Sequence, residues 1–123
     1  TDDLEESLNN IARLRIAAVS TPQGRALRRI VNTESYRFPD IFNAAYRNTA
    51  LPTIKFLAKL LRRETEAGRL ALDEPGKAAN VFMSMVVGGP VAIIESGNTL
   101  SDEEIDERVR YAVRLFLNGA RPR

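Results

Sequence analysis

The side chains that could catalyse a reaction are few in this sequence, and none stands beside a suitable partner. The chain has no His and no Cys, so the commonest general base, the commonest metal ligand and a thiol nucleophile are missing. Carboxylates are densest from Asp102 to Asp106, where a helix is expected to start and acidic groups stabilise its end. Ser84 lies in an apolar segment with no base near it. We therefore expect no enzyme activity, no metal site and no cofactor.

Basic residues occur as adjacent pairs, Arg28-Arg29 and Arg62-Arg63. Neighbouring residues on a helix point about 100° apart, so neither pair forms a clamp for phosphate. The formal net charge is only +2, and no segment has the pattern of a DNA-reading helix-turn-helix. We expect these arginines to be solvated and to pair with nearby acids. Direct DNA binding by this chain is not expected.

Aromatic and methionine side chains suggest a different chemistry, the binding of a small apolar molecule. Methionine adapts to varied shapes, and tyrosine adds a polar group to an apolar wall. Two interpretations stay open, a solid core or a cavity between the middle helices. The candidates for the wall and the polar groups of such a cavity are Tyr36, Phe38, Phe42, Phe56, Leu57, Asn80, Phe82, Met83, Ser84 and Val86.

The segments that position these residues are helical, because apolar residues recur at steps of three and four along most of the chain. The first helix begins almost at the first residue. Five later helices are expected to start at Pro22, Pro39, Pro52, Pro75 and Ser101. The 123 residues suit one domain. The sequence therefore predicts a single all-α domain of six helices over residues 1–123.

Local signals mark several of the helix ends. Thr1 or Asp2 could cap the first helix, and Thr21 is placed to cap the second. Ser101, with Glu104 three residues later, is a capping box. Gly68 is a left-handed stop for the fourth helix. In the second helix, Leu27, Ile30 and Val31 are expected to face inward, and Asp73 with Glu74 is expected to cap the fifth.

The stretch Val81–Ile94 has no charge and is apolar on every side. A helix without a polar face must be covered all round, and at about 14 residues the stretch is shorter than the roughly 20 that cross a bilayer. Pro90 should kink it. Because a small domain cannot easily wrap such a helix alone, we expect a second copy to cover part of it. The predicted interface residues are Val87, Val91, Ile94, Ile105, Val109, Ala112, Val113 and Phe116.

Four motifs resemble a known family, and the likeness spans about Ser20 to Gly119. The run RRIVNTESYRFPD from Arg28 to Asp40 resembles R-x-x-x-x-E-x-x-R-F-P-[ED] in the C-terminal domains of TetR-family transcriptional regulators of the AefR-like group. Gly68-Arg69-Leu70 resembles G-x-L, Asp73 to Ala79 resembles D-P-x-x-A-A with one residue inserted, and FLNG ending at Gly119 resembles F-L-x-G. The Gly89-Pro90 pair departs from the pattern.

The resemblance implies a sensor domain of a transcriptional regulator, with repression the expected mode. It implies a small apolar effector bound among the helices, and a homodimer formed by the last two helices as a four-helix bundle. Operator DNA would be bound only through an N-terminal helix-turn-helix domain that this chain lacks. The cysteine-free composition fits a reducing compartment, expected to be the cytoplasm. No signal peptide or membrane segment is visible, so no membrane partner is expected. The alternative is a helical protein-interaction module that binds no ligand.

Overall fold

The computed structural model describes residues 3–123, which form six helices and no strand. The expected six-helix, all-α architecture is confirmed. A cap supplied by Thr1 or Asp2 falls outside the described residues. The helices are α1 (Asp3–Ser20), α2 (Pro22–Glu34), α3 (Pro39–Asn48), α4 (Ala50–Glu66), α5 (Pro75–Glu95) and α6 (Asp102–Ala120).

Three helix ends follow their local sequence signals. The Thr21 hydroxyl accepts a hydrogen bond from the Gly24 N–H at 3.0 Å, with Pro22 in the first turn of α2. The capping box at Ser101 and Glu104 is complete, with bonds of 3.1 and 3.0 Å. Gly68 follows α4 with φ of +81°, in the left-handed region that glycine enters without strain.

Other helix ends differ from the sequence-based expectation. Helix α4 begins at Ala50 rather than Pro52, since a proline in the first turn lacks only an N–H that would have no helical partner. The predicted cap of α5 by Asp73 and Glu74 is wrong: Glu74 is the N-cap residue, but no side chain caps the helix. Here the fixed φ of Pro75 starts the helix without a side-chain acceptor.

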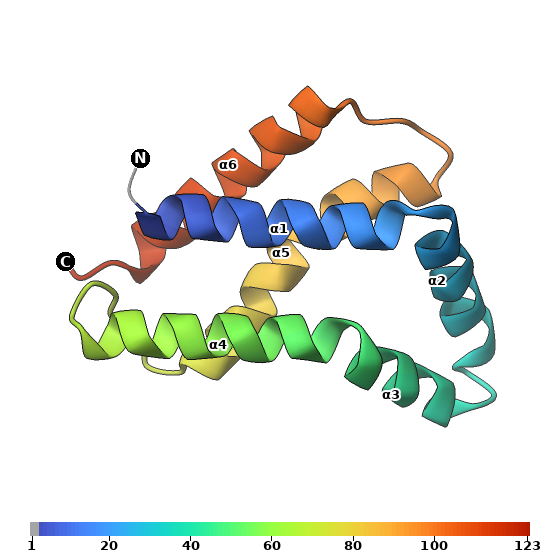
Figure 1. Ribbon diagram of the computed structural model, residues 1–123, viewed down its shortest axis with the longest axis horizontal. Coiled ribbons are helices and arrows are strands. Elements are labelled where there is room, and N and C mark those ends of the chain that lie inside the picture. Colours follow the sequence, from blue (N-terminus) through green and yellow to red (C-terminus); the bar gives the residue numbers. More distant parts are fainter. Residues whose placement is uncertain (1–2) are drawn as a thin grey trace.

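The helices form an open frame around α5 (Figure 1). Helix α5 packs on α4, α1 and α6, and α1 also packs on α6. Helices α2 and α3 join one end of α1 to one end of α4, and each contacts the helix next to it in sequence. The chain stays helical through Pro90, and the two halves of α5 run in different directions in Figure 1, as a proline kink would produce.

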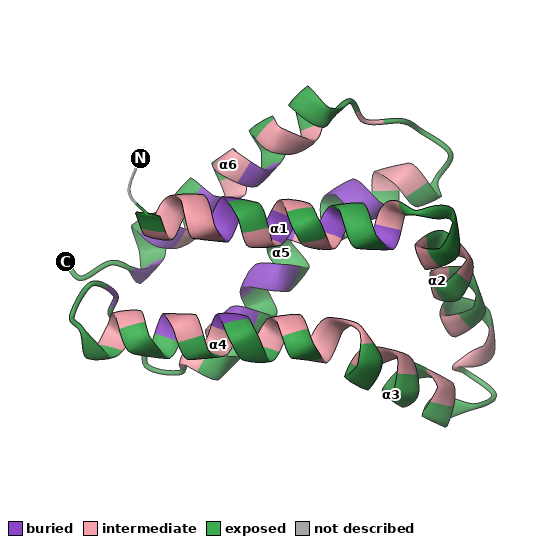
Figure 2. Cartoon of the chain, in the orientation of Figure 1, coloured by how far each residue is buried: buried purple, intermediate pink, exposed green. Residues whose placement is uncertain are grey.

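The core lies where α1, α4, α5 and α6 meet, and Figure 2 shows buried residues on their facing sides. Phe82 is fully buried and meets Phe116 edge to face, with ring centroids 4.9 Å apart. The other fully buried large apolar side chains come from α1, α4 and α6: Leu8, Ile16, Leu57, Leu61, Val109, Val113 and Leu117. A contiguous apolar core of this kind holds the four helices together.

Helices α2 and α3 contribute no buried residue to this core. The expectation that Leu27 and Ile30 face inward is therefore wrong, because their side chains are 41% and 53% exposed. The reason is tertiary: α2 touches only α1 and α3 among the larger helix contacts, so no long helix covers its apolar side. Around α2 and α3, apolar side chains therefore remain exposed instead of packing in the core.

A close approach of α1 and α2 depends on Gly24. A Cβ atom at this position would lie 2.5 Å from the backbone oxygen of Ala18. Backbone cannot move aside as a flexible side chain can, so any larger residue would push the two helices apart. The glycine therefore permits the close approach of α2 to the end of α1.

Candidate ligand-binding site

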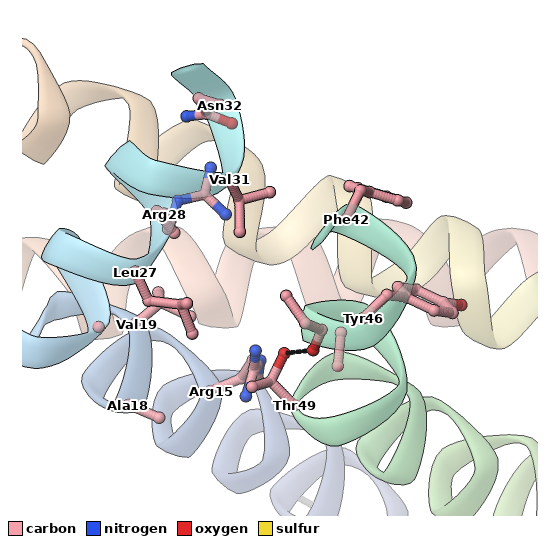
Figure 3. Close-up of a pocket in the computed structure, with 13 residues that line it drawn as sticks. Arg15, Ala18, Val19, Leu27, Arg28, Val31, Asn32, Phe42, Tyr46 and Thr49 are labelled. Carbon is pink, nitrogen blue, oxygen red and sulfur yellow. Dashed lines mark hydrogen bonds between the residues drawn. The ribbon is translucent and has the colours of Figure 1, made fainter. Parts of the chain in front are cut away.

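A pocket of about 430 Å³ lies between α1, α2, α3 and the start of α4. We call it the inter-helix pocket (Figure 3). This volume lies within the roughly 300–1,000 Å³ typical of small-molecule sites. Its lining residues are Arg15, Ala18, Val19, Gly24, Leu27, Arg28, Val31, Asn32, Phe42, Ala45, Tyr46, Thr49 and Ala50.

The apolar wall of the pocket comes from the helices that the core leaves uncovered. Leu27 and Val31 line it from α2, one helical turn apart, and Phe42 and Tyr46 line it from α3 with the same spacing (Figure 3). The Phe42 and Tyr46 rings are 6.0 Å apart and nearly parallel, at 14°. Residues four apart share one face of a helix. Apolar residues of α2 and of α3 thus border the same space.

The polar groups of the pocket differ in whether they have partners. The Thr49 hydroxyl donates to the carbonyl oxygen of Ala45 at 2.6 Å, and the Tyr46 hydroxyl accepts from the Asn80 amide at 3.4 Å. Arg28 donates to both carboxylate oxygens of Glu95, each at 3.2 Å. The Arg15 side chain, in contrast, makes no hydrogen bond or ion pair with any residue in the range 3–123.

The Arg15 guanidinium also lies in an unfavourable setting for a cation. Burial lowers the pKa of Arg15, and the positive charge of Arg28 lowers this pKa further. An arginine side chain nevertheless stays protonated in proteins. The pocket therefore combines apolar residues from α2 and α3 with one positive charge that no residue of the described chain pairs with.

Of the ten residues predicted for a ligand cavity, Phe42 alone lines this pocket. Leu57, Phe82, Met83 and Val86 belong to the packed core. The remaining five are exposed: Tyr36, Phe38, Phe56, Asn80 and Ser84. The pocket is thus formed by α1, α2, α3 and the start of α4, whereas four of the predicted residues, Asn80, Phe82, Met83 and Val86, lie on α5. Asn80 comes near it only through its hydrogen bond to Tyr46.

Sequence reasoning missed most of the lining because α1 was treated as a core helix only. Arg15, Ala18 and Val19 follow one another closely near the end of α1, where α2 turns away. A signal was present: Arg15 interrupts the apolar stripe of α1 close to a helix break. Thr49 and Ala50 are likewise at a helix junction, where backbone and side chains border open space.

The eight predicted interface residues are buried or half-buried within a single chain. Val91, Val109 and Val113 are buried within a single chain, and Phe116 packs on Phe82. Val87, Ile94, Ile105 and Ala112 are half-buried. Apolar side chains that remain exposed on α5 and α6 are Val81, Met85, Tyr111 and Leu115. These four share the α5–α6 surface with a hollow of about 400 Å³, which Met85, Tyr111 and Leu115 help to line.

A second hollow, of about 790 Å³, lies between α1, the end of α5 and the start of α6. It is larger than the inter-helix pocket, and its charged lining residues are Arg13, Arg25 and Asp102, of which Arg13 is paired with Asp106. No group of three or more carboxylates within residues 3–123 is placed to hold a metal ion. The inter-helix pocket is the better candidate for binding a small molecule, because apolar residues of α2 and α3 that the core leaves uncovered border it.

Comparison with known proteins places the chain among transcriptional regulators. Residues 6–119 match the family model for the C-terminal domain of AefR-like transcriptional repressors. No curated protein matches the chain. A solved structure named flavonoid-responsive regulator FrrA is 32% identical, with a TM-score of 0.86, over 98% of this chain and 62% of its own.

A second solved structure supports the same fold. It is a protein from Mesorhizobium loti assigned to the TetR family of transcriptional regulators, 21% identical with a TM-score of 0.84. The match covers 99% of this chain and 61% of that one. The chain thus spans about three fifths of the length of each of these proteins.

Proposed function

We propose, because the chain belongs to the family of AefR-like transcriptional repressor C-terminal domains, that it senses a small molecule in the inter-helix pocket and dimerises through α5 and α6. The observation that carries this proposal is the pair of uncovered apolar faces on α2 and α3, which border the pocket. A bound molecule would remove these faces from water. Burial of apolar area is the main favourable term in such binding.

The effector that fits best is a planar aromatic molecule. The lining holds Leu27 and Val31 together with the stacked rings of Phe42 and Tyr46, and aromatic rings favour offset or edge contacts with other rings. The similar regulator FrrA is named for its response to flavonoids. Flavonoids are flat aromatic compounds, so one of them is a reasonable first probe for this chain.

The dimer proposal rests on the incomplete cover of α5. By length and composition this helix could cross a membrane, but core helices of soluble proteins share these two features. Only a third of the most apolar window is buried in one chain, and Val81 and Met85 remain 56% and 38% exposed. A second copy packed on α5 and α6 would cover the remainder, as an apolar patch of this kind requires.

The proposed function of the whole protein is repression that an effector relieves. The solved relatives are longer than this chain, and we propose that operator DNA is bound by a helix-turn-helix domain outside it, in the cytoplasm. Effector binding between α1 and the α2–α3 pair would favour one orientation of α1. In a dimer, that shift would change the spacing of two DNA-binding domains.

The first prediction concerns the pocket. Apigenin, a flavonoid, should stabilise the protein by about 2.7 kcal/mol at 100 times its dissociation constant. Replacing Ala45 by Phe places a ring in the pocket and should weaken apigenin binding at least tenfold, because the occupied volume is lost. Isothermal titration calorimetry measures the affinity, and thermal unfolding measures the stabilisation.

The matched control is Ala44→Phe, which adds the same ring to the exposed neighbour of Ala45 on α3 and should leave the affinity unchanged. Equal loss in both variants would show that the ring acts by disturbing α3 rather than by filling the pocket. If neither apigenin nor a library of apolar compounds shifts the melting temperature, the ligand-free interaction module becomes the better description.

A further inference from the structure

The lining of the inter-helix pocket carries positive charge without any acidic side chain to balance it. Two of its thirteen residues are arginines, and none is Asp or Glu. Arg28 is already engaged, because Glu95 of α5 accepts a hydrogen bond from its Nε and another from its Nη2, each at 3.2 Å. Its charge is therefore largely neutralised by an acid outside the lining.

Arg15 is the group left without a counter-charge. It is half-buried, lines the pocket from α1, and has no hydrogen-bond or ion-pair partner within residues 3–123. Figure 3 shows its side chain reaching from α1 into the space that α2 and α3 border. A partly desolvated guanidinium gains from an anion more than a solvated one does, because water competes less for it.

Polar groups near Arg15 do not take this role. The Thr49 hydroxyl donates to a backbone carbonyl, and the Tyr46 hydroxyl is already contacted by the Asn80 amide. A hydroxyl is in any case a weak partner for a cation compared with a carboxylate, which can accept two parallel N–H bonds from one guanidinium. The unmet requirement of the pocket is thus an anionic oxygen.

We infer that the effector carries an acidic oxygen group, a carboxylate or an ionised phenol, on its planar apolar body, and that Arg15 binds this group. The inference rests on the proposed function of the pocket and narrows its ligand class. It changes the sequence-based expectation of an apolar effector to that of an aromatic acid. The ring system lies between the apolar faces of α2 and α3, and the anion lies toward α1.

Two matched pairs of probes test this assignment. The first pair is 2-naphthoic acid and 2-naphthamide, which differ in charge but hardly in shape. The second pair is apigenin and its trimethyl ether, which cannot ionise. Affinities for all four are measured by calorimetry at pH 7 and pH 9 with the wild-type chain and with Arg15→Gln, Arg15→Lys and Arg29→Gln.

The expected result is a preference of the wild type for 2-naphthoate over the amide of about tenfold or more, as for a charge-assisted pair. Arg15→Gln should bring this ratio of affinities close to one, because 2-naphthoate binds more weakly. Arg15→Lys should restore part of the preference for the acid. Arg29→Gln removes one positive charge from an exposed residue outside the lining and should leave the ratio unchanged. If the preference for apigenin over its ether grows from pH 7 to pH 9, the ionised phenol is the group that Arg15 binds.

Equal affinity for acid and amide in the wild type, with no preference for apigenin over its ether, overturns the inference. So does a ratio that Arg15→Gln leaves unchanged. In both cases the proposed function stands if Ala45→Phe, measured with the same probes, weakens binding of the neutral ones at least tenfold. Binding that Ala45→Phe does not affect, or no binding of any probe, counts against the pocket itself.

Discussion

At the scale of single residues, Asn9 is the unusual member of the core. It is fully buried on α1, the one polar residue among the buried side chains of the described chain. Neither its amide oxygen nor its amide nitrogen has a hydrogen-bond partner of normal geometry, and its contribution to the lowered pKa of Glu6 is the smallest of those acting there. A buried polar group without partners costs free energy.

Asn9→Leu should therefore stabilise the protein, by about 1–2 kcal/mol, because leucine has the branching of asparagine without its polar atoms. Urea unfolding at pH 7 measures the change in midpoint. Asn9→Ala is the comparison variant and should destabilise, since it leaves a cavity. A loss of stability in the leucine variant would mean that the amide makes a contact, for example with an ordered water, which leucine cannot replace.

At the scale of elements, α1 is fastened to α6 by a group of charged residues. Arg110 donates to Glu6 of α1 and to Asp106 of its own helix, each at 2.9 Å, and Arg13 of α1 also pairs with Asp106. The hydrogen bond from Arg110 is the main cause that lowers the pKa values of Glu6 and Asp106. The network links α1, which carries Arg15, to α6, which belongs to the proposed dimer interface.

This network predicts a specific pH dependence. The folded-state pKa values of Glu6 and Asp106 are lowered. Their contribution to the free energy of unfolding is therefore fully present above the ordinary carboxylate pKa of about 4. It is lost as the pH falls through the lower, folded-state values. Arg110→Gln should lower the free energy of unfolding at pH 7 and flatten its fall between pH 5 and pH 2, so that variant and wild type converge in acid.

Urea unfolding at pH 7, 5, 4, 3 and 2 measures how the free energy of unfolding changes with pH in the wild type and in Arg110→Gln. Arg62→Gln removes an exposed arginine of α4 and should leave the pH slope as it is in the wild type. Parallel curves for wild type and Arg110→Gln at all pH values would contradict the network, since the two carboxylates would then titrate alike in both proteins.

At the scale of the whole molecule, the proposed dimer determines how the exposed α5–α6 surface is covered. Leu115 on α6 is 56% exposed and is a better probe of an interface than Val113, which is fully buried in one chain. We expect the wild type to sediment as a dimer at micromolar concentration, with an interface above about 1,000 Å². Leu115→Glu should weaken the dimer by roughly 2 kcal/mol, about thirtyfold in dissociation constant.

The control is Leu14→Glu, which changes an even more exposed leucine, 71% exposed on α1, and should leave the dimer intact. Far-ultraviolet circular dichroism checks that both variants keep their helices. A wild-type monomer at these concentrations, or equal dissociation by both substitutions, would argue against pairing through α5 and α6.

The sequence by itself determined the helices and the family. Three- and four-residue periodicity, the capping box at Ser101 and the stop at Gly68 are local signals, and the structure confirms each of them. The four short motifs led to the AefR-like group, which the family comparison confirms. The family is one of regulators rather than enzymes, in agreement with the expectation drawn from the missing histidine and cysteine.

Only the tertiary structure decided which apolar faces are covered. Periodicity shows that α2 has an apolar face, but not that Leu27 borders a pocket while Leu57 is sealed in the core. Burial depends on which distant helices meet, and on a close crossing such as the one at Gly24. Charge partners are equally non-local: Glu95 is 67 residues from Arg28, and that pairing leaves Arg15 as the free cation in the lining.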